Sequence, residues 1–300
     1  MTGKETLPGY VLVTPARNEA RFIERTLRSV VAQTVLPIRW AIVSDGSTDG
    51  TDRIVGSYAD AHPWIELVRL PERRERHFAG KVHAFNAGYD AVRHLPYDVI
   101  GNIDADISFD ETFLATLLAR LAADPKLGLV GAPFRESASN DTYDYRFVSI
   151  EHVSGCCQLF RRECFEQIGG YKPVKAGGID HIAVITSRMM GWKTRTFPEI
   201  SCMHHRDIGS AQDGVLSSRF KYGGKDYSLG GHPLWELFRS AYQMTKQPYV
   251  LGGLALFSGY LWSMARRAER PVSPELMAFH RGEQMQRLRN FLSGRLPRRD

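Results

Sequence analysis

Three runs of β-forming residues each end in a polar cluster, and this arrangement limits the fold more than any other feature of the chain. The runs cover residues 10–13, 40–43 and 99–103, and the clusters cover residues 14–19, 43–51 and 102–106. In an open α/β sheet, ligands bind at the edge where the carboxyl ends of parallel strands meet. The sequence therefore predicts a binding site built from these three clusters.

The third cluster, Asn102-Ile-Asp-Ala-Asp106, places two carboxylates two residues apart, at Asp104 and Asp106. Such a pair can hold a divalent cation with oxygen ligands while the cation bridges to phosphate. This pattern is typical of an enzyme that handles a phosphorylated, nucleotide-linked substrate.

Strand and helix patterns alternate up to about residue 200. Strands are expected at residues 10–14, 40–44, 65–70, 99–103, 127–132 and 194–197, and helices at 19–33, 50–58, 81–93 and 111–122. Alternation of this kind implies parallel pairing with right-handed crossovers. The predicted fold class is α/β, with a mostly parallel central sheet flanked by helices.

From about residue 205 helical patterns replace strands, and arginines and aromatic residues become frequent. We expect two domains, an α/β catalytic domain over residues 1–206 and a helical, basic extension over residues 207–300. Residues 247–265 carry no charge and lie between Lys246 and the pair Arg266-Arg267. This run is near the ~20 residues that span a bilayer, but glycines interrupt it. A buried helix, a helix in the membrane interface and a spanning helix are the alternatives, in that order.

Charge and cysteine content narrow the classes of partner. A formal net charge of +6 and a pI near 9.2 suit a surface that meets anionic lipid or a phosphorylated acceptor. Because no nucleic-acid-binding motif accompanies the charge, nucleic acid is not expected. The four cysteines form no CxxC pair, which disfavours zinc and indicates buried free thiols. No apolar signal segment opens the chain, so we expect a cytoplasmic protein, either free or peripheral on the cytoplasmic face of the inner membrane.

Two motifs near the N-terminus carry a family resemblance. Pro15-Ala-Arg-Asn-Glu19 is similar to the P-x-x-N-E loop of family 2 glycosyltransferases, and residues 44–51 (SDGSTDGT) resemble the family's D-D-G-S-x-D-x-T loop, with Ser44 in place of the first Asp. The resemblance implies the Rossmann-like GT-A fold. It also implies nucleotide contacts by Pro15, Ala16, Arg17, Asn18, Glu19 and Asp45, the last of these to the base. On chemical grounds, Asn18 can cap the following helix and Glu19 can accept a hydrogen bond from a ribose hydroxyl.

Two further motifs concern the diphosphate. Residues 80–88 (GKVHAFNAG) resemble the family's G-K-x-x-A-x-N-x-G segment, and Asp104-Ala-Asp106 resembles its DxD motif. The resemblance implies that Lys81 contacts the diphosphate of the donor and that Asp104 and Ala105 line the nucleotide site. It implies Mn²⁺ or Mg²⁺ as the cofactor, ligated by Asp106. A lysine near a helix N-terminus also suits a phosphate on physical grounds.

The resemblance extends to about residue 206. Ser154-Gly155 and Gly178-Ile-Asp180 match later family segments, and Asp180 falls on the family's general base, which takes the proton of the acceptor hydroxyl. Ile179 replaces the glutamate that usually precedes it. Gly155 and Ile179 are expected near the sugar and the acceptor. His204 and His205 are both candidates for a late metal ligand, and the sequence does not separate them.

The expected function is inverting transfer of a sugar from a nucleotide-diphosphate sugar, with UDP favoured, to an acceptor hydroxyl. The expected acceptor is a saccharide, linked to polyprenyl diphosphate, in surface polysaccharide synthesis. Two alternatives stay open: a catalytically silent nucleotide-binding relative, raised by Ser44 and Ile179, and a transferase that uses GDP-mannose and a soluble acceptor. A sugar nucleotidyltransferase or a dinucleotide dehydrogenase would need a glycine-rich loop after the first strand, and residues 14–20 contain no glycine.

Overall fold

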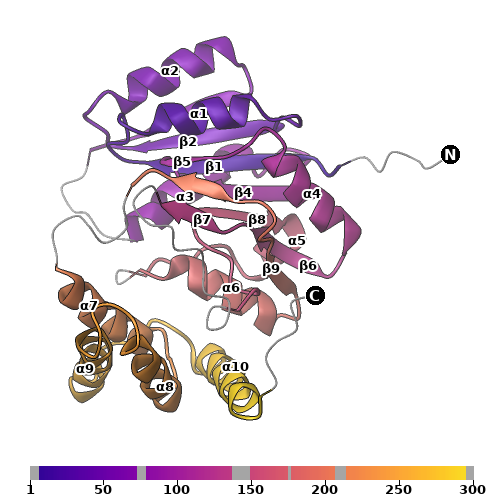
Figure 1. The fold of residues 1–300 in the computed structure, drawn as a ribbon. Coiled ribbons are helices and arrows are strands. Elements are labelled where there is room, and N and C mark those ends of the chain that lie inside the picture. Colours follow the sequence, from indigo (N-terminus) through magenta and orange to yellow (C-terminus); the bar gives the residue numbers. More distant parts are fainter. Residues whose placement is uncertain (1–6, 73–78, 137–148, 175–176, 207–213, 295–300) are drawn as a thin grey trace. The chain divides into compact units, whose positions relative to one another are not determined.

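The computed structural model describes residues 7–72, 79–136, 149–174, 177–206 and 214–294 (Figure 1). The chain divides into two compact units. One consists of residues 1–175 with 179–206, and the other of residues 176–178 with 207–300. The described residues of the first unit form strands and helices, and those of the second form helices.

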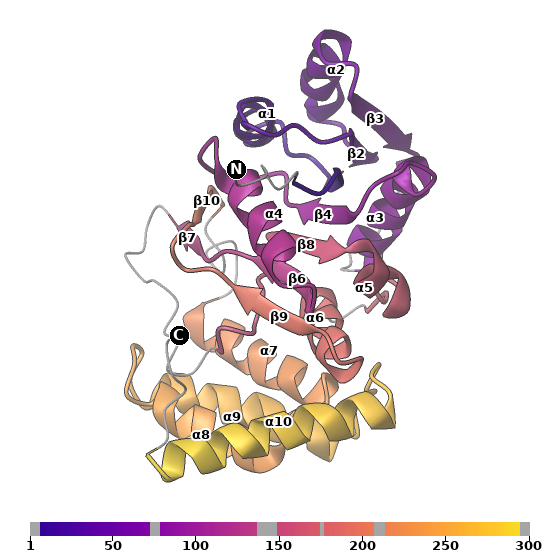
Figure 2. The ribbon, with the colours of Figure 1, turned by 90° about the vertical axis from the view of Figure 1, so that its right-hand side faces the viewer.

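The first unit is built on a seven-stranded sheet with the order β3-β2-β1-β4-β8-β6-β9 (Figure 1 and Figure 2). Its strands are β1 (Tyr10–Ala16), β2 (Arg39–Asp45), β3 (Ile65–Leu70), β4 (Val99–Ile103), β6 (Leu127–Gly131), β8 (Cys157–Arg161) and β9 (Lys193–Thr196). β1 pairs in parallel with β2 and β4, β2 with β3, and β6 with β9. The predicted α/β class with a mostly parallel sheet is therefore confirmed.

Strand β8 is not among the strands expected from the alternating pattern, and it departs from the parallel pairing of the other strands in this sheet. It is antiparallel to both β4 and β6, and its first residue, Cys157, pairs with Ile103 at the end of β4. The segment that precedes β8 therefore reaches the sheet edge at which the acidic pair begins. An antiparallel strand inserted between parallel ones leaves no mark in the hydrophobic pattern, because a strand buried on both faces reads the same in either direction.

Helices cover both faces of the sheet. Leu12 and Trp40 belong to a hydrophobic core that includes residues of α1 (Ile23–Val31), α2 (Thr51–Ala61) and α4 (Phe113–Ala123). The other face carries α3 (Ala79–Val92), where a Cβ atom added to Gly88 would lie 2.6 Å from Val13 Cγ1 and 2.8 Å from Val43 Cγ2. Burial on both faces fixes the strand register, and with it the polar residues at the strand ends.

A second, three-stranded sheet brings a late segment of the chain to the acidic pair. Its order is β5 (Ile107–Ser108), β10 (Cys202–His204) and β7 (Phe134–Glu136). β10 is antiparallel to β5, with His204 opposite Ile107, and parallel to β7. Because β5 begins directly after Asp106, this register places His204 beside that carboxylate. Two further helices complete the unit, α5 (Arg162–Gln167) and α6 (Ile179–Met189).

The second unit contains α7 (Val215–Ser228), α8 (Pro233–Gln243), α9 (Leu251–Ala265) and α10 (Pro274–Leu292). Glycines bring α7 and α9 into backbone contact. A Cβ atom added to Gly223 would lie 1.8 Å from the carbonyl oxygen of Leu256, and one added to Gly259 would lie 1.9 Å from that of Phe220. Gly259, one of the glycines that interrupt the uncharged run 247–265, therefore lies in the contact between α7 and α9, where only the absence of a side chain permits such close approach.

The opposite face of α9 is apolar and exposed. Leu251, Leu254, Leu261 and Trp262, spaced to lie on one side of the helix, each expose more than a third of their surface. The three sequence alternatives thus become a helix with one face packed and one face uncovered within its own unit. Among the described residues, no helix is long and apolar enough to cross a membrane.

A buried carboxyl group should make the stability of the helical unit depend on pH. Glu236 of α8 is 2% exposed, and its Oε1 has no hydrogen-bond partner among the described residues. Burial and the Asp226 carboxylate raise the pKa of Glu236, the Arg239 guanidinium lowers it, and the net pKa rises from 4.5 to about 8. Between about pH 5 and pH 8 the folded unit therefore binds more protons than the unfolded chain, and the free energy of unfolding should fall as pH rises.

Glu236→Gln should remove most of this fall, because a neutral amide cannot ionise. The gap between the variant and the wild type should open between pH 5 and pH 8, in favour of the variant, to the order of a few kcal/mol. Urea unfolding of both proteins at a series of pH values measures it. Parallel pH profiles for the two proteins would contradict a raised pKa at Glu236.

Candidate active site

Three strand ends meet at one edge of the main sheet. The parallel register sets Ala16 opposite Ser44 and Val13 opposite Asn102, so β1, β2 and β4 all end on the same side. Pro15 and Ala16 are the last residues of β1, and Asp45 is the last of β2. The convergence predicted for the polar clusters follows from this register.

The first two clusters are joined by hydrogen bonds between their loops. The bonds run from Asn18 N to Ser47 Oγ (3.1 Å), from Thr48 N to Asn18 Oδ1 (2.8 Å), from Glu19 N to Thr51 Oγ1 (2.9 Å) and from Ala20 N to Asp49 Oδ2 (3.0 Å). Sequence reasoning missed this role of Ser47, Asp49 and Thr51. The sequence does show a loop rich in hydroxyl and carboxyl groups. Which backbone N–H groups those side chains accept from depends, however, on the other loop, about thirty residues away in the chain.

The predicted helix cap at Asn18 is wrong. Its backbone has a φ of +55°, in the left-handed region that asparagine tolerates, and its Oδ1 accepts from the Thr48 backbone N–H. The helix accordingly begins at Ile23, four residues after its predicted start. Asn18 thus shapes the loop that precedes the helix by fastening it to the second cluster.

Asp45, the predicted contact to the base, is almost fully buried at the end of β2. Its Oδ2 lies 3.8 Å from the Arg17 guanidinium. Arg17 and Asp45 therefore face each other across the two loops, and a base that reaches Asp45 meets both an acceptor and a fixed cation there.

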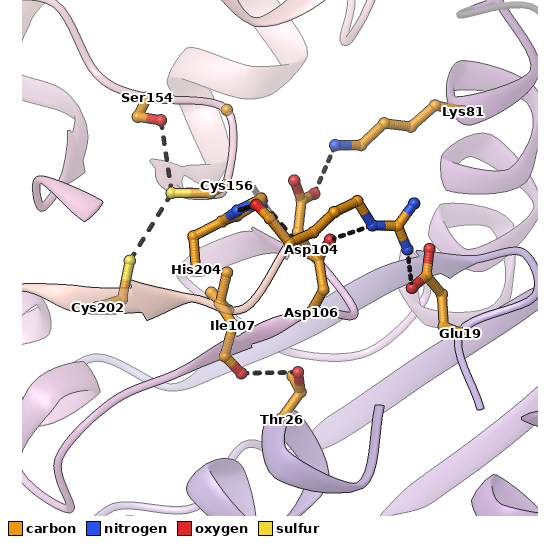
Figure 3. Close-up of polar contacts among 12 residues, drawn as sticks. Glu19, Thr26, Lys81, Asp104, Asp106, Ile107, Ser154, Cys156, Cys202 and His204 are labelled. Carbon is orange, nitrogen blue, oxygen red and sulfur yellow. Dashed lines mark hydrogen bonds and ion pairs between the residues drawn. The ribbon is translucent and has the colours of Figure 1, made fainter. Parts of the chain in front are cut away.

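The carboxylate of Asp104 forms an ion pair with a lysine. Lys81 Nζ of α3 lies 2.5 Å from Asp104 Oδ1, and the Asp104 backbone N–H donates to the carbonyl oxygen of Cys156 (Figure 3). Burial acts to lower the pKa of Lys81, but the carboxylates of Asp104, Asp180 and Asp106 outweigh it, and the pKa is raised. Lys81 therefore stays charged beside the DxD pair. Ala105, between the two aspartates, is buried.

Asp106 is the more buried member of the pair and lies close to Arg206 and His204. Its Oδ2 lies 3.2 Å from Arg206 Nε, and its Oδ1 lies 3.5 Å from His204 Nε2. Burial and the Asp104 carboxylate raise the pKa of Asp106, while His204, Arg206 and Lys81 lower it, and the net direction is upward. The raised pKa means that the ionised Asp106 carboxylate is destabilised in this site, so additional positive charge would stabilise it.

The structure distinguishes the two histidines that the sequence left equivalent. Arg25 Nη1 lies 2.8 Å from His205 Nδ1, and Ser108 Oγ lies 2.8 Å from His205 Nε2. Both ring nitrogens of His205 are therefore engaged away from the acidic pair. Burial, together with the Arg25 charge, lowers the pKa of His205. Both effects favour the neutral form of its ring. For this reason His205 is not proposed as a metal ligand, and His204 is the remaining candidate.

The two ring nitrogens of His204 have different neighbours, and Nε2 is the one that lies near Asp106. Its Nδ1 lies 2.5 Å from the carbonyl oxygen of Arg206, and because a carbonyl only accepts, Nδ1 must carry the proton. The other ring nitrogen, Nε2, lies 3.5 Å from Asp106 Oδ1. Metal-binding histidines are commonly oriented in this way, with the second ring nitrogen donating to a backbone carbonyl.

The donor atoms around Asp106 fit a divalent cation. Carboxylate oxygens suit Mg²⁺ and Mn²⁺, and an imidazole nitrogen extends the set. Lys81 and Arg206 now supply the positive charge. Within the described ranges, no three His, Cys, Asp or Glu side chains are arranged to hold a metal ion.

Asp180 lies in the first turn of α6, beside the loop that precedes β8. A Cβ atom added to Gly155 would lie 2.9 Å from Asp180 Oδ2, so a larger residue there would displace the carboxylate. The carbonyl of Gly155 accepts from Asn102 Nδ2 at 3.1 Å, which ties this loop to the end of β4. Gly155 was expected to leave room for a sugar, and the group it visibly leaves room for is Asp180. Ile179 is buried.

The four cysteines are all free and buried, as predicted. Cys156 and Cys202 approach to 3.7 Å between their sulfur atoms (Figure 3). Burial and the neighbouring thiol Cys156 raise the pKa of Cys202 well above its ordinary value, so these thiols pack as apolar groups.

The profile of glycosyl transferase family 2 matches residues 11–169, just over half of the 300 residues. The chain belongs to glycosyl transferase family 2. The matched region contains the two N-terminal loops, the Lys81 segment, the DxD pair and Gly155. Asp180 and His204 lie beyond it.

Curated family 2 relatives match over part of their length. The poly-beta-1,6-N-acetyl-D-glucosamine synthase of Staphylococcus aureus (strain COL) is 28% identical over 153 residues, which are 51% of this chain and 35% of the relative. The probable glycosyltransferase YdaM of Bacillus subtilis (strain 168) is 28% identical over 214 residues, 64% of this chain and 49% of the relative. The chain thus matches between a third and a half of the length of these relatives.

Solved structures share the fold of this family 2 chain. The mannosyltransferase PcManGT of Pyrobaculum calidifontis, in complex with GDP-Man and Mn²⁺, has a TM-score of 0.60 and 22% identity over 97% of this chain and 84% of its own. TarS of S. aureus, in complex with UDP-GlcNAc, has a TM-score of 0.54 and 11% identity over 96% of this chain and 84% of its own. The family resemblance and the GT-A fold drawn from the sequence are confirmed.

Proposed function

We propose that this protein transfers a sugar, with inversion, from a nucleotide-diphosphate sugar to an acceptor hydroxyl. The observation that carries the proposal is the group at the carboxyl edge of the sheet. There the carboxylates of Asp104 and Asp106 face Lys81, Arg206 and His204, in a chain of glycosyl transferase family 2. Acidic and basic side chains gathered at one strand edge suit a diphosphate and the cation that accompanies it.

The nucleotide is assigned to the two loops that hydrogen bonds join, which are residues 15–19 and the loop at the end of β2. Asp45 is the acceptor for a base donor, and the imide N–H of uracil is such a donor, so UDP is the favoured nucleotide. GDP-mannose is kept as the second donor, because the solved structure with the higher identity of the two above binds GDP-Man. Lys81 is assigned to the diphosphate.

A divalent cation, Mn²⁺ or Mg²⁺, would be held by Asp106 and His204 with Asp104 beside them. When bound, such a cation neutralises negative charge on the departing diphosphate. Lys81, whose pKa is raised by the carboxylates around it, remains protonated and contributes the same kind of stabilisation from the protein.

Asp180 is proposed as the general base. Its carboxylate takes the proton of the acceptor hydroxyl as that oxygen forms a bond to the anomeric carbon, while the bond from that carbon to the diphosphate oxygen breaks. Attack from the face opposite the nucleotide gives inversion. Gly155 acts as a positioning residue, since its missing side chain is what allows the Asp180 carboxylate its place.

For the acceptor, we propose a saccharide on a polyprenyl diphosphate, reached at a membrane surface. The uncovered apolar face of α9 supports this, because Leu251, Leu254 and Trp262 are exposed on it. Exposed Arg266 and Arg267 follow the helix directly. An apolar face flanked by arginines matches an anionic lipid interface in both hydropathy and charge.

Leu254→Glu should weaken binding to vesicles that contain anionic lipid, by roughly tenfold or more, because it places a charge on the apolar face. Leu36→Glu is the matched control, since Leu36 has the same exposure, 47%, and belongs to the other unit. Co-sedimentation with anionic vesicles measures both variants against the wild type. Equal losses in the two variants, or no vesicle binding by the wild type, would contradict the membrane proposal.

The function itself is tested by incubating the protein with UDP-sugars and GDP-mannose, Mn²⁺ and lipid-linked saccharide acceptors. We expect a glycosylated product whose anomeric configuration, read by NMR, is opposite to that of the donor. Retention of configuration would overturn the mechanism. Nucleotide binding without transfer to lipid-linked or soluble saccharides would favour the catalytically silent alternative that Ser44 and Ile179 raise.

A further inference from the structure

One arginine spans two largely buried carboxylates of the site, those of Glu19 and Asp106. Arg206 Nη2 donates a hydrogen bond to Glu19 Oε2, and Arg206 Nε lies 3.2 Å from Asp106 Oδ2. The two acidic side chains are 13% and 11% exposed, whereas the arginine side chain is 45% exposed. A planar guanidinium with several donors can bridge two carboxylates in this way, and a single ammonium cannot do so as well.

The bridge relieves repulsion within the site. Burial raises the pKa of Glu19, Arg206 lowers it, the Asp106 and Asp104 carboxylates raise it, and the net pKa is about 7. The same guanidinium opposes the raised pKa of Asp106. Arg206 therefore supplies, at these two carboxylates, the positive charge that would otherwise have to come from a bound cation.

A guanidinium and a divalent cation compete for the same carboxylate. Arg206 Nε lies 3.2 Å from Asp106 Oδ2, while Asp106 Oδ1 lies 3.5 Å from His204 Nε2. A cation that binds Asp106 through either oxygen meets the charge of the guanidinium at close range, and like charges at such separations repel strongly in a partly buried site. The cation therefore binds well only when Arg206 has withdrawn from Asp106.

The Arg206 side chain can move away from Asp106 without disturbing the core. Its side chain is half exposed and rests against the Phe22 ring, 5.6 Å from the ring centroid. Its backbone carbonyl separately accepts the Nδ1 proton of His204. The side chain can therefore leave Asp106 while the backbone still aims the imidazole at it.

We propose that Arg206 occupies the place of the divalent cation in the nucleotide-free protein and moves to the diphosphate when the nucleotide binds, so that cation and nucleotide bind cooperatively. Because it concerns the donor site, this inference rests on the proposed function. The diphosphate offers the guanidinium a new anionic partner, and its arrival frees Asp106 for the cation.

The test is Mn²⁺ binding, followed by the EPR signal of free Mn²⁺, with and without UDP. Without nucleotide, Arg206→Ala should bind Mn²⁺ roughly tenfold more tightly than the wild type. The increase in Mn²⁺ affinity caused by UDP should be smaller in the variant by a similar factor. Arg206→Lys, which keeps the charge but loses the bridge, should lie between the two and serves if the alanine variant fails to fold.

Arg21→Ala is the matched control. Arg21 carries the same charge and also packs on the Phe22 ring, 5.1 Å from its centroid, and its removal should leave the nucleotide-free Mn²⁺ affinity at the wild-type value. An Arg206→Ala protein whose nucleotide-free Mn²⁺ affinity is unchanged or weaker overturns the inference. UDP binding by the wild type, measured in the same samples, shows in that case whether the proposed donor site itself survives.

Discussion

Replacing Asp180 by asparagine is expected to lower the turnover of glycosyl transfer by roughly 10²–10⁴-fold, the range that a general base contributes. The amide keeps the size of the carboxylate, so it fits the space beside Gly155, but it cannot accept the proton of the acceptor hydroxyl. Nucleotide binding should be unchanged, because Asp45 and Lys81 are untouched. Steady-state kinetics and UDP calorimetry on the same preparation separate the two effects.

The control for this variant is Asp60→Asn, which makes the same change at an exposed position of α2 and should leave both turnover and binding at the wild-type values. Near wild-type turnover in Asp180→Asn would remove Asp180 as the base. Loss of nucleotide binding together with turnover would instead indicate that the carboxylate holds the site together, through its charge beside Lys81.

Replacing Gly223 by alanine is expected to destabilise the helical unit by about 3 kcal/mol. In an exposed helix this substitution normally stabilises, by up to about 1 kcal/mol, because alanine is the better helix former. Here the added methyl would lie 1.8 Å from the Leu256 carbonyl oxygen and 2.8 Å from the Tyr260 nitrogen. Both are backbone atoms of α9, so the clash can be relieved only if the two helices move apart.

Gly282→Ala in α10 gives the matched comparison. Nothing lies within 4 Å of a Cβ atom added at Gly282, so that variant should be as stable as the wild type or slightly more so. Urea unfolding followed by circular dichroism compares the three proteins. A Gly223→Ala protein that unfolds at the wild-type urea concentration would contradict the close packing of α7 on α9.

The main sheet could be predicted because its strands are short apolar runs with clear polar ends. The run at residues 65–70 is the strand Ile65–Leu70, and the run at 99–103 is Val99–Ile103. The antiparallel direction of β8 could not be predicted, since burial on both faces gives the same pattern either way. The start of α1 was misplaced because Asn18 bonds to Thr48, a partner fixed only by the fold.

The candidate site was predictable where chemistry is local. Asp104 and Asp106 identify themselves by their spacing and by the strand that precedes them. The choice between His204 and His205 was not local, because it depends on which ring nitrogen meets Arg25, Ser108 or a backbone carbonyl. The bridge from Arg206 to Glu19 joins residues 187 positions apart, and no sequence pattern connects them.

The most direct test of the central claim is calorimetric titration of UDP and of GDP into the protein, first with Mn²⁺ and then with EDTA. We predict that UDP binds in the presence of Mn²⁺, that GDP binds more weakly, and that EDTA or the substitution Asp106→Asn removes most of the UDP affinity. A folded protein that binds neither nucleotide with Mn²⁺ present, or that binds UDP equally well with EDTA and with Asp106→Asn, would contradict a metal-assisted nucleotide-sugar site at the DxD pair.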